Sequence, residues 1–156
     1  CIEVTSMDKK ELKTVMEKEI DLVQGCISRM AQNSFVIKGW TITLIAVALA
    51  LLPEKFDAKL LCGISIVATT CFWYLDAFYL KMERLYRLKY QWLIANRLET
   101  DEYCYDLNPH NSKMRLPKEE KEPCILRVMF TKTLLPIYGP IVLFTLIVLV
   151  NLKPCG

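Results

Sequence analysis

Apolar and polar residues are segregated into long blocks along this chain. Three stretches are almost wholly apolar: 35–52, 60–75 and 134–152. The third carries no charged side chain, and the first carries only Lys38. A helix crosses a hydrocarbon core of ~30 Å with about 20 apolar residues, and it satisfies its own backbone hydrogen bonds there. The pattern therefore predicts three transmembrane helices.

The polar block before the first apolar stretch predicts an amphipathic helix over residues 8–33. Its apolar residues recur at spacings of four and three, as in a heptad stripe. The stripe consists of Met16, Ile20, Val23, Ile27 and Met30. It spans only about two heptads. Packing within one subunit, a seam between subunits and a membrane-surface helix all remain open interpretations.

The second apolar stretch continues into a polar region without a helix breaker. No Gly or Pro occurs from Cys71 to Glu99, so residues 59–99 predict one helix of about 60 Å. Turn-forming residues then predict an irregular connection over 101–125. We predict an all-α integral membrane protein with three transmembrane helices, the second extended into a long cytoplasmic helix. Its expected parts are an N-terminal cytoplasmic amphipathic helix (1–33), a transmembrane hairpin (34–77), a cytoplasmic helix with its irregular connection (78–133) and a third transmembrane helix (134–153).

Composition supports this division and suggests an orientation. Of the 156 residues, 53% are hydrophobic and 24% are charged, so the charge is concentrated outside the apolar stretches. Residues 1–38 hold six Lys and Arg and residues 78–133 hold eleven, whereas 53–59 and 153–156 together hold three. Positively charged segments stay on the cytoplasmic side. The N-terminus is therefore expected in the cytoplasm.

The sequence offers little for catalysis or metal binding. Its seven cysteines form no C-x-x-C pair, which argues against a disulfide framework and a structural zinc site. Its one histidine, His110, lacks the partners of a catalytic relay, and no Gly-rich phosphate loop is present. We predict no enzyme activity, no catalytic residue, no metal and no cofactor.

Lys38 and Asp76 are the most informative pair of charges. Counted from the turn between the first two apolar stretches, they lie ~22 and ~25 Å into their helices. Ionisable side chains at membrane depth are costly unless paired or hydrated, so we predict an ion pair. The alternatives are a snorkelling lysine beside an aspartate that opens the cytoplasmic helix, a structural bridge, and a gate or ion path.

Two further groups are candidate sites. Lys81, Arg84 and Arg87 recur every third residue and either form a solvated, membrane-anchoring face or bind an anionic ligand or lipid headgroup. Five hydroxyl residues within the apolar stretches either line a pore or helix contacts, or bond to their own helix backbone. These are Thr41, Thr43, Ser65, Thr69 and Thr70.

Three strings carry a resemblance to known proteins: RMAQNSFVIKGW at 29–40, FWYLDAFYLKMERLYR at 72–87 and TLLPIYG at 133–139. Together they resemble small bacterial multi-span membrane proteins of phage-defence type. The chain is also similar to the pore-forming membrane accessory protein of type VI-B CRISPR systems. That protein is associated with a HEPN-type Arg/His motif, which this chain lacks because Arg97 lies thirteen positions before His110. The resemblance implies a bacterial inner-membrane location and a defence role, and it transfers no catalytic residue.

The expected function is a homo-oligomeric membrane effector that forms a pore or disrupts the inner membrane in antiviral defence. Three helices are too few to enclose a conduit alone, so a pore requires a ring of subunits. The alternative is a non-conducting membrane anchor or scaffold that recruits a cytoplasmic partner. The expected partners are membrane lipid and further copies of the chain, and a cytoplasmic protein or nucleotide trigger is left open.

Overall fold

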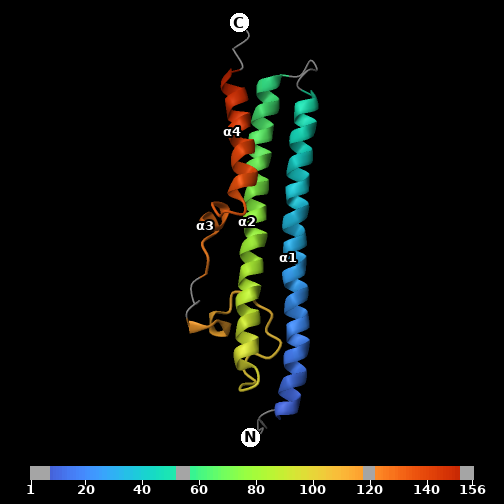
Figure 1. Ribbon diagram of the computed structural model, residues 1–156, viewed down its shortest axis with the longest axis vertical. Helices are drawn as coiled ribbons and strands as arrows, with labels where there is room; N and C mark the ends of the chain where they lie inside the picture. The colour runs from blue at the N-terminus through green and yellow to red at the C-terminus, as the bar shows by residue number, and fades with distance from the viewer. Residues whose placement is uncertain (1–7, 52–56, 118–121, 152–156) are drawn as a thin grey trace. The chain divides into compact units, whose positions relative to one another are not determined.

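The computed structural model describes residues 8–51, 57–117 and 122–151, and all the regular structure in these ranges is helical. The elements in chain order are α1 (Lys9–Leu51), α2 (Ala58–Asn96), the 3-10 helix η1 (Ser112–Met114), α3 (Ile125–Met129) and α4 (Leu135–Asn151) (Figure 1). The all-α class predicted from the sequence is confirmed.

Acidic side chains begin both long helices. The Asp8 carboxylate accepts from the Lys9 amide at 2.7 Å, and Glu11 accepts from the Asp8 amide at 3.2 Å. This reciprocal arrangement satisfies amides that have no partner inside α1. Asp57 similarly accepts from the Lys59 amide at 3.0 Å at the start of α2.

The chain divides into two compact units. Unit 1 comprises residues 1–31 and 81–123, and unit 2 comprises 32–80 and 124–156. Both long helices contribute to both units, since α1 runs unbroken through residue 31 and α2 through residue 80. The amphipathic segment and the first apolar stretch are therefore parts of one helix.

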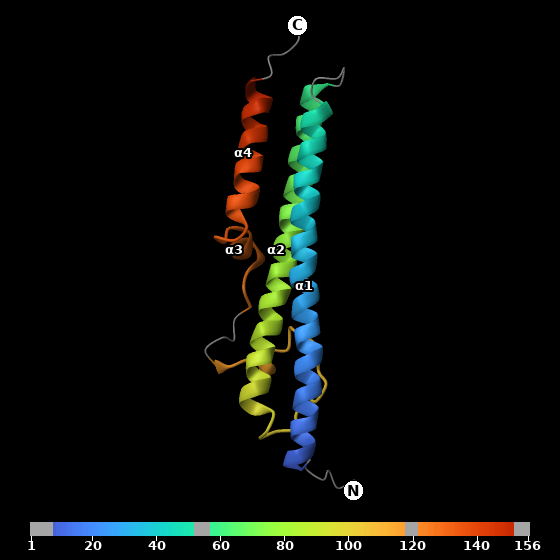
Figure 2. The same cartoon turned by 45° about the vertical axis from the view of Figure 1, so that its right-hand side comes forward.

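Unit 1 packs the first part of α1 against the last part of α2. These segments lie side by side in two views, with the chain beyond Asn96 folded against them (Figures 1 and 2). Its buried core consists of Val23, Trp92, Leu93 and Met114. The predicted irregular connection is indeed built mainly of turns around η1.

Unit 2 contains the last part of α1, the first part of α2, α3 and α4. Its buried apolar cluster joins Ala77 of α2 to Val128, Leu134 and Tyr138. The Trp73 indole donates to the Met129 carbonyl at 3.0 Å, and its ring stacks on Tyr138 at a centroid distance of 5.9 Å. These contacts fix the start of α4 against α2.

The structure differs from the sequence-based boundaries in three places. The second helix ends at Asn96 rather than near Glu99, and α4 begins at Leu135. Residues 124–133 join the apolar unit 2 rather than the polar part, because Val128 and Met129 pack on α2 and α4. The predicted ends at Leu52 and Lys153 lie outside the described residues.

Within the described residues, α1 and α2 are long and apolar enough to cross a membrane, whereas α4 is apolar but shorter. Only 11% of the most apolar stretch of α1 and 28% of that of α2 are buried inside the chain. The core helix of a soluble protein would be mostly covered by its own chain.

Candidate functional site: a buried carboxylate in unit 2

A fully buried carboxylate, that of Asp76 on α2, lies at the centre of a polar network in unit 2. The Lys38 ammonium lies 2.9 Å from Asp76 Oδ1 and 2.8 Å from Oδ2. The Ser34 hydroxyl donates to Oδ1, and the Tyr138 hydroxyl donates to Oδ2 at 2.9 Å. Two helices, α1 and α4, thus supply donors to one carboxylate on α2, which offsets the cost of burying its charge.

Local helix geometry places these donors. Ser34 and Lys38 are four residues apart on α1 and therefore share a face. Lys38 Nζ also lies 2.6 Å from Ser34 Oγ. Tyr138 lies in the first turn of α4, where Trp73 stacks on its ring. The Lys38 side chain is 20% exposed, so the network is reached from outside through the lysine.

The contact between Ser34 and Lys38 has the composition of a Ser–Lys nucleophile pair, but its chemistry differs. A general base must have a free lone pair to take the serine proton. Here the lysine nitrogen donates to both carboxylate oxygens of Asp76 and to Ser34, which is the behaviour of an ammonium. The arrangement favours holding charge, and moving protons between oxygens, over nucleophilic attack.

The ion pair predicted from the sequence is present, since the structure brings Lys38 and Asp76 together. Its depth in a bilayer remains a prediction. Sequence reasoning missed Ser34 and Tyr138. Ser34 could have been found from its position one helical turn before Lys38, whereas Tyr138 requires knowing how α4 packs.

The five candidate hydroxyl residues separate into two groups. Thr41, Ser65 and Thr69 are buried inside unit 2, and Thr43 and Thr70 are exposed. Thr43 donates to the Gly39 carbonyl at 3.0 Å and Thr70 to the Ile66 carbonyl at 2.8 Å, so both bond to their own helix. The buried Thr41 also bonds to its own helix, since it donates to the Ile37 carbonyl at 2.9 Å. Lining of a pore or of helix contacts by any of the five remains a prediction.

The proposed oligomer stripe is partly used inside its own chain. Val23 is fully buried in the core of unit 1, and Ile27 packs against that core. Val23 and Ile27 thus pack within one subunit, which is one of the interpretations left open, and a seam between subunits remains a prediction. The inward face of α1 instead follows Leu12, Val15, Glu19, Val23 and Cys26, which includes a charged residue that an apolar pattern cannot reveal. Met16, Ile20 and Met30 are half-buried, and their role between subunits remains a prediction.

The basic residues of α2 have different surroundings. Lys81 lies 3.3 Å from Glu122, and Arg87 lies 2.7 Å from Glu83. Arg84 is half-buried. Two of these three cations therefore have carboxylate partners in unit 1, and binding of an anionic ligand or lipid headgroup remains a prediction.

A second buried ion pair, Glu19 with Arg97, holds unit 1 together. Arg97 Nε lies 2.6 Å from Glu19 Oε2, and Nη2 lies 3.1 Å from Oε1, with side-chain exposures of 0% and 2%. The guanidinium also donates to the carbonyls of Thr100, Glu102 and Tyr103 at 3.2, 2.6 and 3.1 Å. One arginine thus fixes the turn that follows α2.

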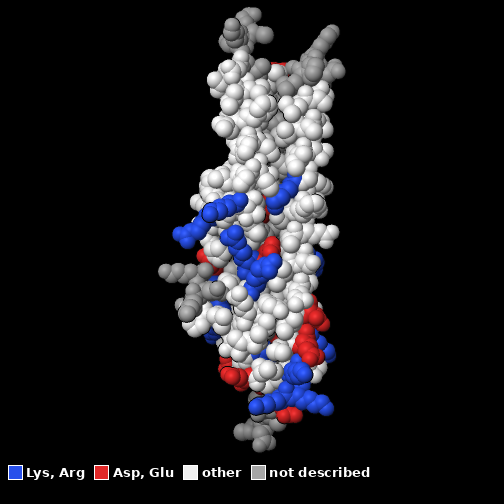
Figure 3. Space-filling view, in the orientation of Figure 1, with Lys and Arg blue, Asp and Glu red and all other residues white. Residues whose placement is uncertain are grey.

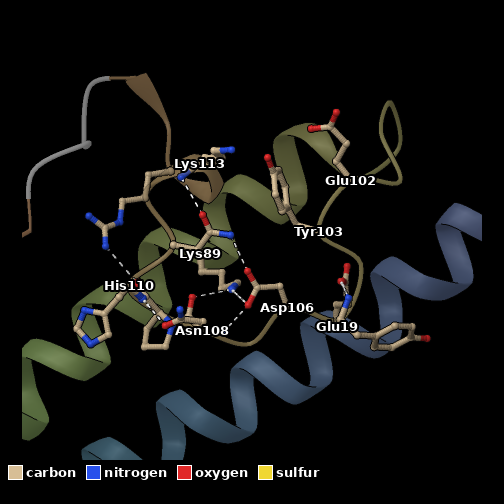
Figure 4. Close-up of polar contacts among 12 residues, drawn as sticks. Glu19, Lys89, Glu102, Tyr103, Asp106, Asn108, His110 and Lys113 are labelled. Carbon is tan, nitrogen blue, oxygen red and sulfur yellow. Dashed lines mark hydrogen bonds and ion pairs between the residues drawn. The ribbon is translucent and has the colours of Figure 1, made fainter.

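Figure 4 shows this turn and the polar residues around it. Tyr103 and Tyr105 both have left-handed backbone conformations, with φ of 57° and 56°. Such conformations are uncommon outside glycine and persist where surrounding contacts hold them. Here Arg97 binds the Tyr103 carbonyl, and the Tyr105 amide donates to Glu19. The buried ion pair therefore stabilises a strained turn.

Lys89 and Asp106 form the neighbouring cluster. Lys89 Nζ lies 2.9 Å from the Asn108 carbonyl and 3.6 Å from Asp106 Oδ1 (Figure 4). Burial lowers the pKa of Lys89, opposed by the nearby Asp106 charge. Burial alone would raise the pKa of Asp106, but hydrogen bonds from Asn111, Asn108 and Lys89 outweigh it and lower the pKa.

Glu122 gathers three basic groups at the end of unit 1. Its carboxylate lies 2.9 Å from His110 Nδ1, 3.0 Å from Arg115 Nη2 and 3.3 Å from Lys81 Nζ. The hydrogen bond to His110, followed by that to Arg115, lowers the pKa of Glu122 to about 2. His110 thus acts as a carboxylate partner. Within 8–51, 57–117 and 122–151, no three His, Cys, Asp or Glu side chains group as metal ligands would.

Comparison of the chain with protein-family models, with curated proteins and with solved structures finds no match.

Proposed function

We propose that this chain is an integral membrane protein that acts as a homo-oligomeric effector and permeabilises the bacterial inner membrane. Unit 2 supplies three membrane spans and unit 1 faces the cytoplasm. Antiviral defence is the setting suggested by the resemblance of residues 29–40, 72–87 and 133–139 to bacterial defence proteins. The proposal rests on one observation, the inverted polarity of unit 2.

The interior of unit 2 is as polar as it is apolar. Its buried residues include six with polar or charged side chains: Ser34, Thr41, Ser65, Thr69, Asp76 and Thr145. Its exterior is apolar, with many large side chains more than half exposed, among them Ile42, Val67 and Val150 at 60%, 65% and 82%. Water would favour the opposite arrangement, whereas hydrocarbon solvates this one.

Unit 1 also buries charged side chains, those of Glu19, Lys89, Arg97 and Arg115, and it differs from unit 2 at its surface. Its core is built of Val23, Leu93 and Met114, and its surface carries charge. On the face drawn in Figure 3, charged side chains are common over unit 1 and almost absent over α4 and the neighbouring parts of α1 and α2. The two units are thus suited to two different solvents.

Helix lengths match a bilayer. At 1.5 Å per residue, the parts of α1 and α2 within unit 2 are about 30 and 35 Å long, and α4 is about 26 Å. A hydrocarbon core is ~30 Å thick. A short helix adapts to this thickness by local thinning of the bilayer or through flanking residues. All three segments are therefore usable as spans, and the Lys and Arg distribution favours a cytoplasmic unit 1.

Permeation of hydrated ions requires more than one copy. The cavity between α1, α2 and α4 has a volume of about 30 Å³, which is room for a water molecule but not for a hydrated ion. The exposed outer face carries a shallow groove lined by Trp40, Thr43, Leu44, Val47 and Phe72, in which Thr43 is polar. A small residue or hydroxyl on such a face permits close helix contact between copies.

Two measurements test the proposal. Native mass in detergent is expected at a multiple of the 18.1 kDa chain, and purified protein in liposomes is expected to release an entrapped dye or K⁺. Val67→Asp on the outward face is the informative variant, and Lys59→Asp beside the helix start is its control for added negative charge. A monomeric protein that stays in the bilayer and releases nothing would exclude the effector role.

A non-conducting anchor is the second candidate, favoured by the separate core of unit 1. A compact, water-exposed module attached to membrane spans is suited to binding a cytoplasmic protein. This candidate predicts a monomer or dimer without conductance, and unit 1 would retain its binding when the spans are replaced by an unrelated membrane anchor.

A further inference from the structure

The chain that leads into α4 is apolar on two sides. We call residues 125–135, which comprise α3 and the turn after it, the entry segment. On its inward side, Val128 and Leu134 are fully buried in the apolar cluster of unit 2. On its outward side, Leu126 and Phe130 are 61% and 62% exposed, and the Phe130 amide donates to the Leu126 carbonyl at 3.3 Å. Packing within unit 2 therefore accounts for only half of the apolar side chains of the segment.

The entry segment also carries two basic side chains, Arg127 and Lys132, and both are exposed. Among residues 8–51, 57–117 and 122–151, neither finds a partner for an ion pair or a side-chain hydrogen bond. The basic residues of unit 1 differ, since Lys81, Arg87 and Arg97 each pair with a glutamate. The charges of the entry segment are thus left for a partner outside unit 2.

This end of unit 2 is positively charged. The carboxylates of unit 2 within 32–51, 57–80 and 124–151 are those of Asp57 and Asp76. Asp57 precedes the start of α2, whereas Asp76 is fully buried and already paired with Lys38. Three cations and one carboxylate at this end leave a net charge of +2, which Arg127 and Lys132 carry at the surface.

Aromatic contacts hold the entry segment in place. The ring of Trp73 on α2 lies 5.4 Å from that of Phe130, at an interplanar angle of 70°, and also stacks on Tyr138 of α4. The Trp73 indole donates to the Met129 carbonyl. Both views show α3 beside α2 at the beginning of α4 (Figures 1 and 2). The outward side is therefore fixed at one end of the α4 span.

Exposed apolar and basic side chains on one short segment are typical of chain that lies at the level of lipid headgroups. With α4 crossing the hydrocarbon core, Lys132 lies three residues before the span begins. The apolar stems of Arg127 and Lys132 can follow the acyl chains while their charged ends reach the phosphates. Each Lys or Arg near an anionic membrane surface strengthens binding by about fivefold.

We propose that the entry segment binds anionic phospholipid at the cytoplasmic end of unit 2. Arg127 and Lys132 contact the headgroup phosphate, and Leu126 and Phe130 contact the acyl chains. The ligand is a lipid and not a free phosphate, because a soluble anion would leave both apolar side chains in water. The lipid is anionic because the ammonium group of a zwitterionic headgroup offsets the attraction to the two cations. This inference rests on the membrane placement proposed above and requires neither a ring of subunits nor permeation.

The test uses Trp73 as the reporter, because its ring contacts Phe130. The parent chain carries Trp40→Phe, since Trp40 is 66% exposed on α1 and would report other lipids, whereas Trp92 is 8% exposed in the core of unit 1. Purified chain is placed in phosphatidylcholine vesicles with increasing fractions of brominated phosphatidylglycerol or brominated phosphatidylcholine, and bromine quenches nearby tryptophan. Brominated phosphatidylglycerol is expected to reach half-maximal quenching at an about fivefold lower fraction, or lower still.

Charge variants identify the site. Arg127→Gln with Lys132→Gln is expected to bring the two lipids within about twofold of each other, because both headgroup contacts are removed. Arg127→Lys with Lys132→Arg keeps the charge and should keep the preference. Lys59→Gln, an exposed cation at the other end of unit 2, should also keep it. High salt should weaken the preference, since the cations are exposed.

Three results would overturn the proposal: equal quenching by the two lipids in the parent chain, an unchanged preference in the double glutamine variant, and loss of the preference when soluble glycerol phosphate is added at constant ionic strength. The last would indicate a free-anion site. Flotation of the vesicles after alkaline carbonate treatment reports insertion separately. A parent chain that does not insert refutes the membrane placement, whereas insertion without lipid preference refutes this inference alone. The substituted cations are exposed, so all variants should melt within a few degrees of the parent chain.

Discussion

Arg97→Met tests the energetics of unit 1 most directly. The substitution keeps much of the side-chain volume and removes the guanidinium that neutralises Glu19. The Glu19 side chain is 2% exposed, so its carboxylate would be left buried and without its charge partner. Breaking a buried ion pair by removing one partner costs about 3–5 kcal/mol, much of which is the cost of the remaining charge.

The loss of stability expected for Arg97→Met can be compared with that for a second arginine of the same helix. Arg87 is also an arginine of α2 paired with a glutamate, but its side chain is 60% exposed. Exposed pairs contribute ~0–1 kcal/mol, so Arg87→Met should change little. For a chain of this size, 1 kcal/mol corresponds to about 2–4 °C in melting temperature, which predicts a loss of roughly 6–20 °C for Arg97→Met.

The assay is thermal unfolding in detergent of a chain in which the six other cysteines are replaced by serine or alanine, followed by the reaction of a fluorogenic maleimide with the buried Cys26 of unit 1. Hydrogen exchange should also accelerate between residues 97 and 108, because the turn carbonyls lose their donor. The double variant Glu19→Leu with Arg97→Met should recover most of the loss, since no buried charge remains. If the single and double variants lose the same stability, the unpaired charge is not the cause and the reasoning fails.

Three further predictions concern other contacts. Asp76→Leu should lower the melting temperature in detergent less than Lys38→Met does, because Lys38→Met leaves the buried Asp76 carboxylate with only hydroxyl donors. A larger loss for Asp76→Leu would contradict this reasoning. Acidification should weaken the contacts of Glu122, because its pKa in the folded chain is about 2 and the ordinary value is 4.5. The stability that Glu122 contributes is complete above pH 4.5 and is lost as the pH falls from about 4.5 to 2. Proteolysis near residue 117 should increase over this pH range, and Glu122→Gln should abolish the pH dependence. Val67→Asp should oppose membrane insertion by about 2.5–3.5 kcal/mol and shift the protein to the carbonate-soluble fraction, whereas insertion equal to that of wild type would show that this face does not contact lipid.

Much of the fold follows from the sequence because long apolar segments leave few alternatives. The absence of breakers from Cys71 onward predicted that α2 would extend well beyond its apolar stretch, and it does so to Asn96. Lys38 and Asp76 lie at similar distances along their helices from the short turn between them, which predicted that they meet, and the pair is 2.8 Å apart. Both results depend only on the rise per residue of a helix and on residues that are close in the sequence.

The missed contacts depend on packing of distant segments. Glu19 and Arg97 are 78 positions apart, and no periodicity marks them as partners. The apolar stripe chosen on α1 lay about one position from the face that is buried, because that face includes Glu19 and Ser34. A helix that buries polar residues for specific partners cannot be oriented from hydrophobicity alone.

The polar interior of unit 2 also separates a purely structural role from a functional one. Helices in lipid pack well through small and apolar side chains, and a single polar contact between them contributes only about 1 kcal/mol. Stability alone therefore gives little reason to bury an unpaired hydroxyl at Thr69 in line with the charged pair Lys38 and Asp76. An anchor would lose nothing if valine replaced Thr69, so in that case the variant should melt at least as high as wild type and bind and insert as wild type does.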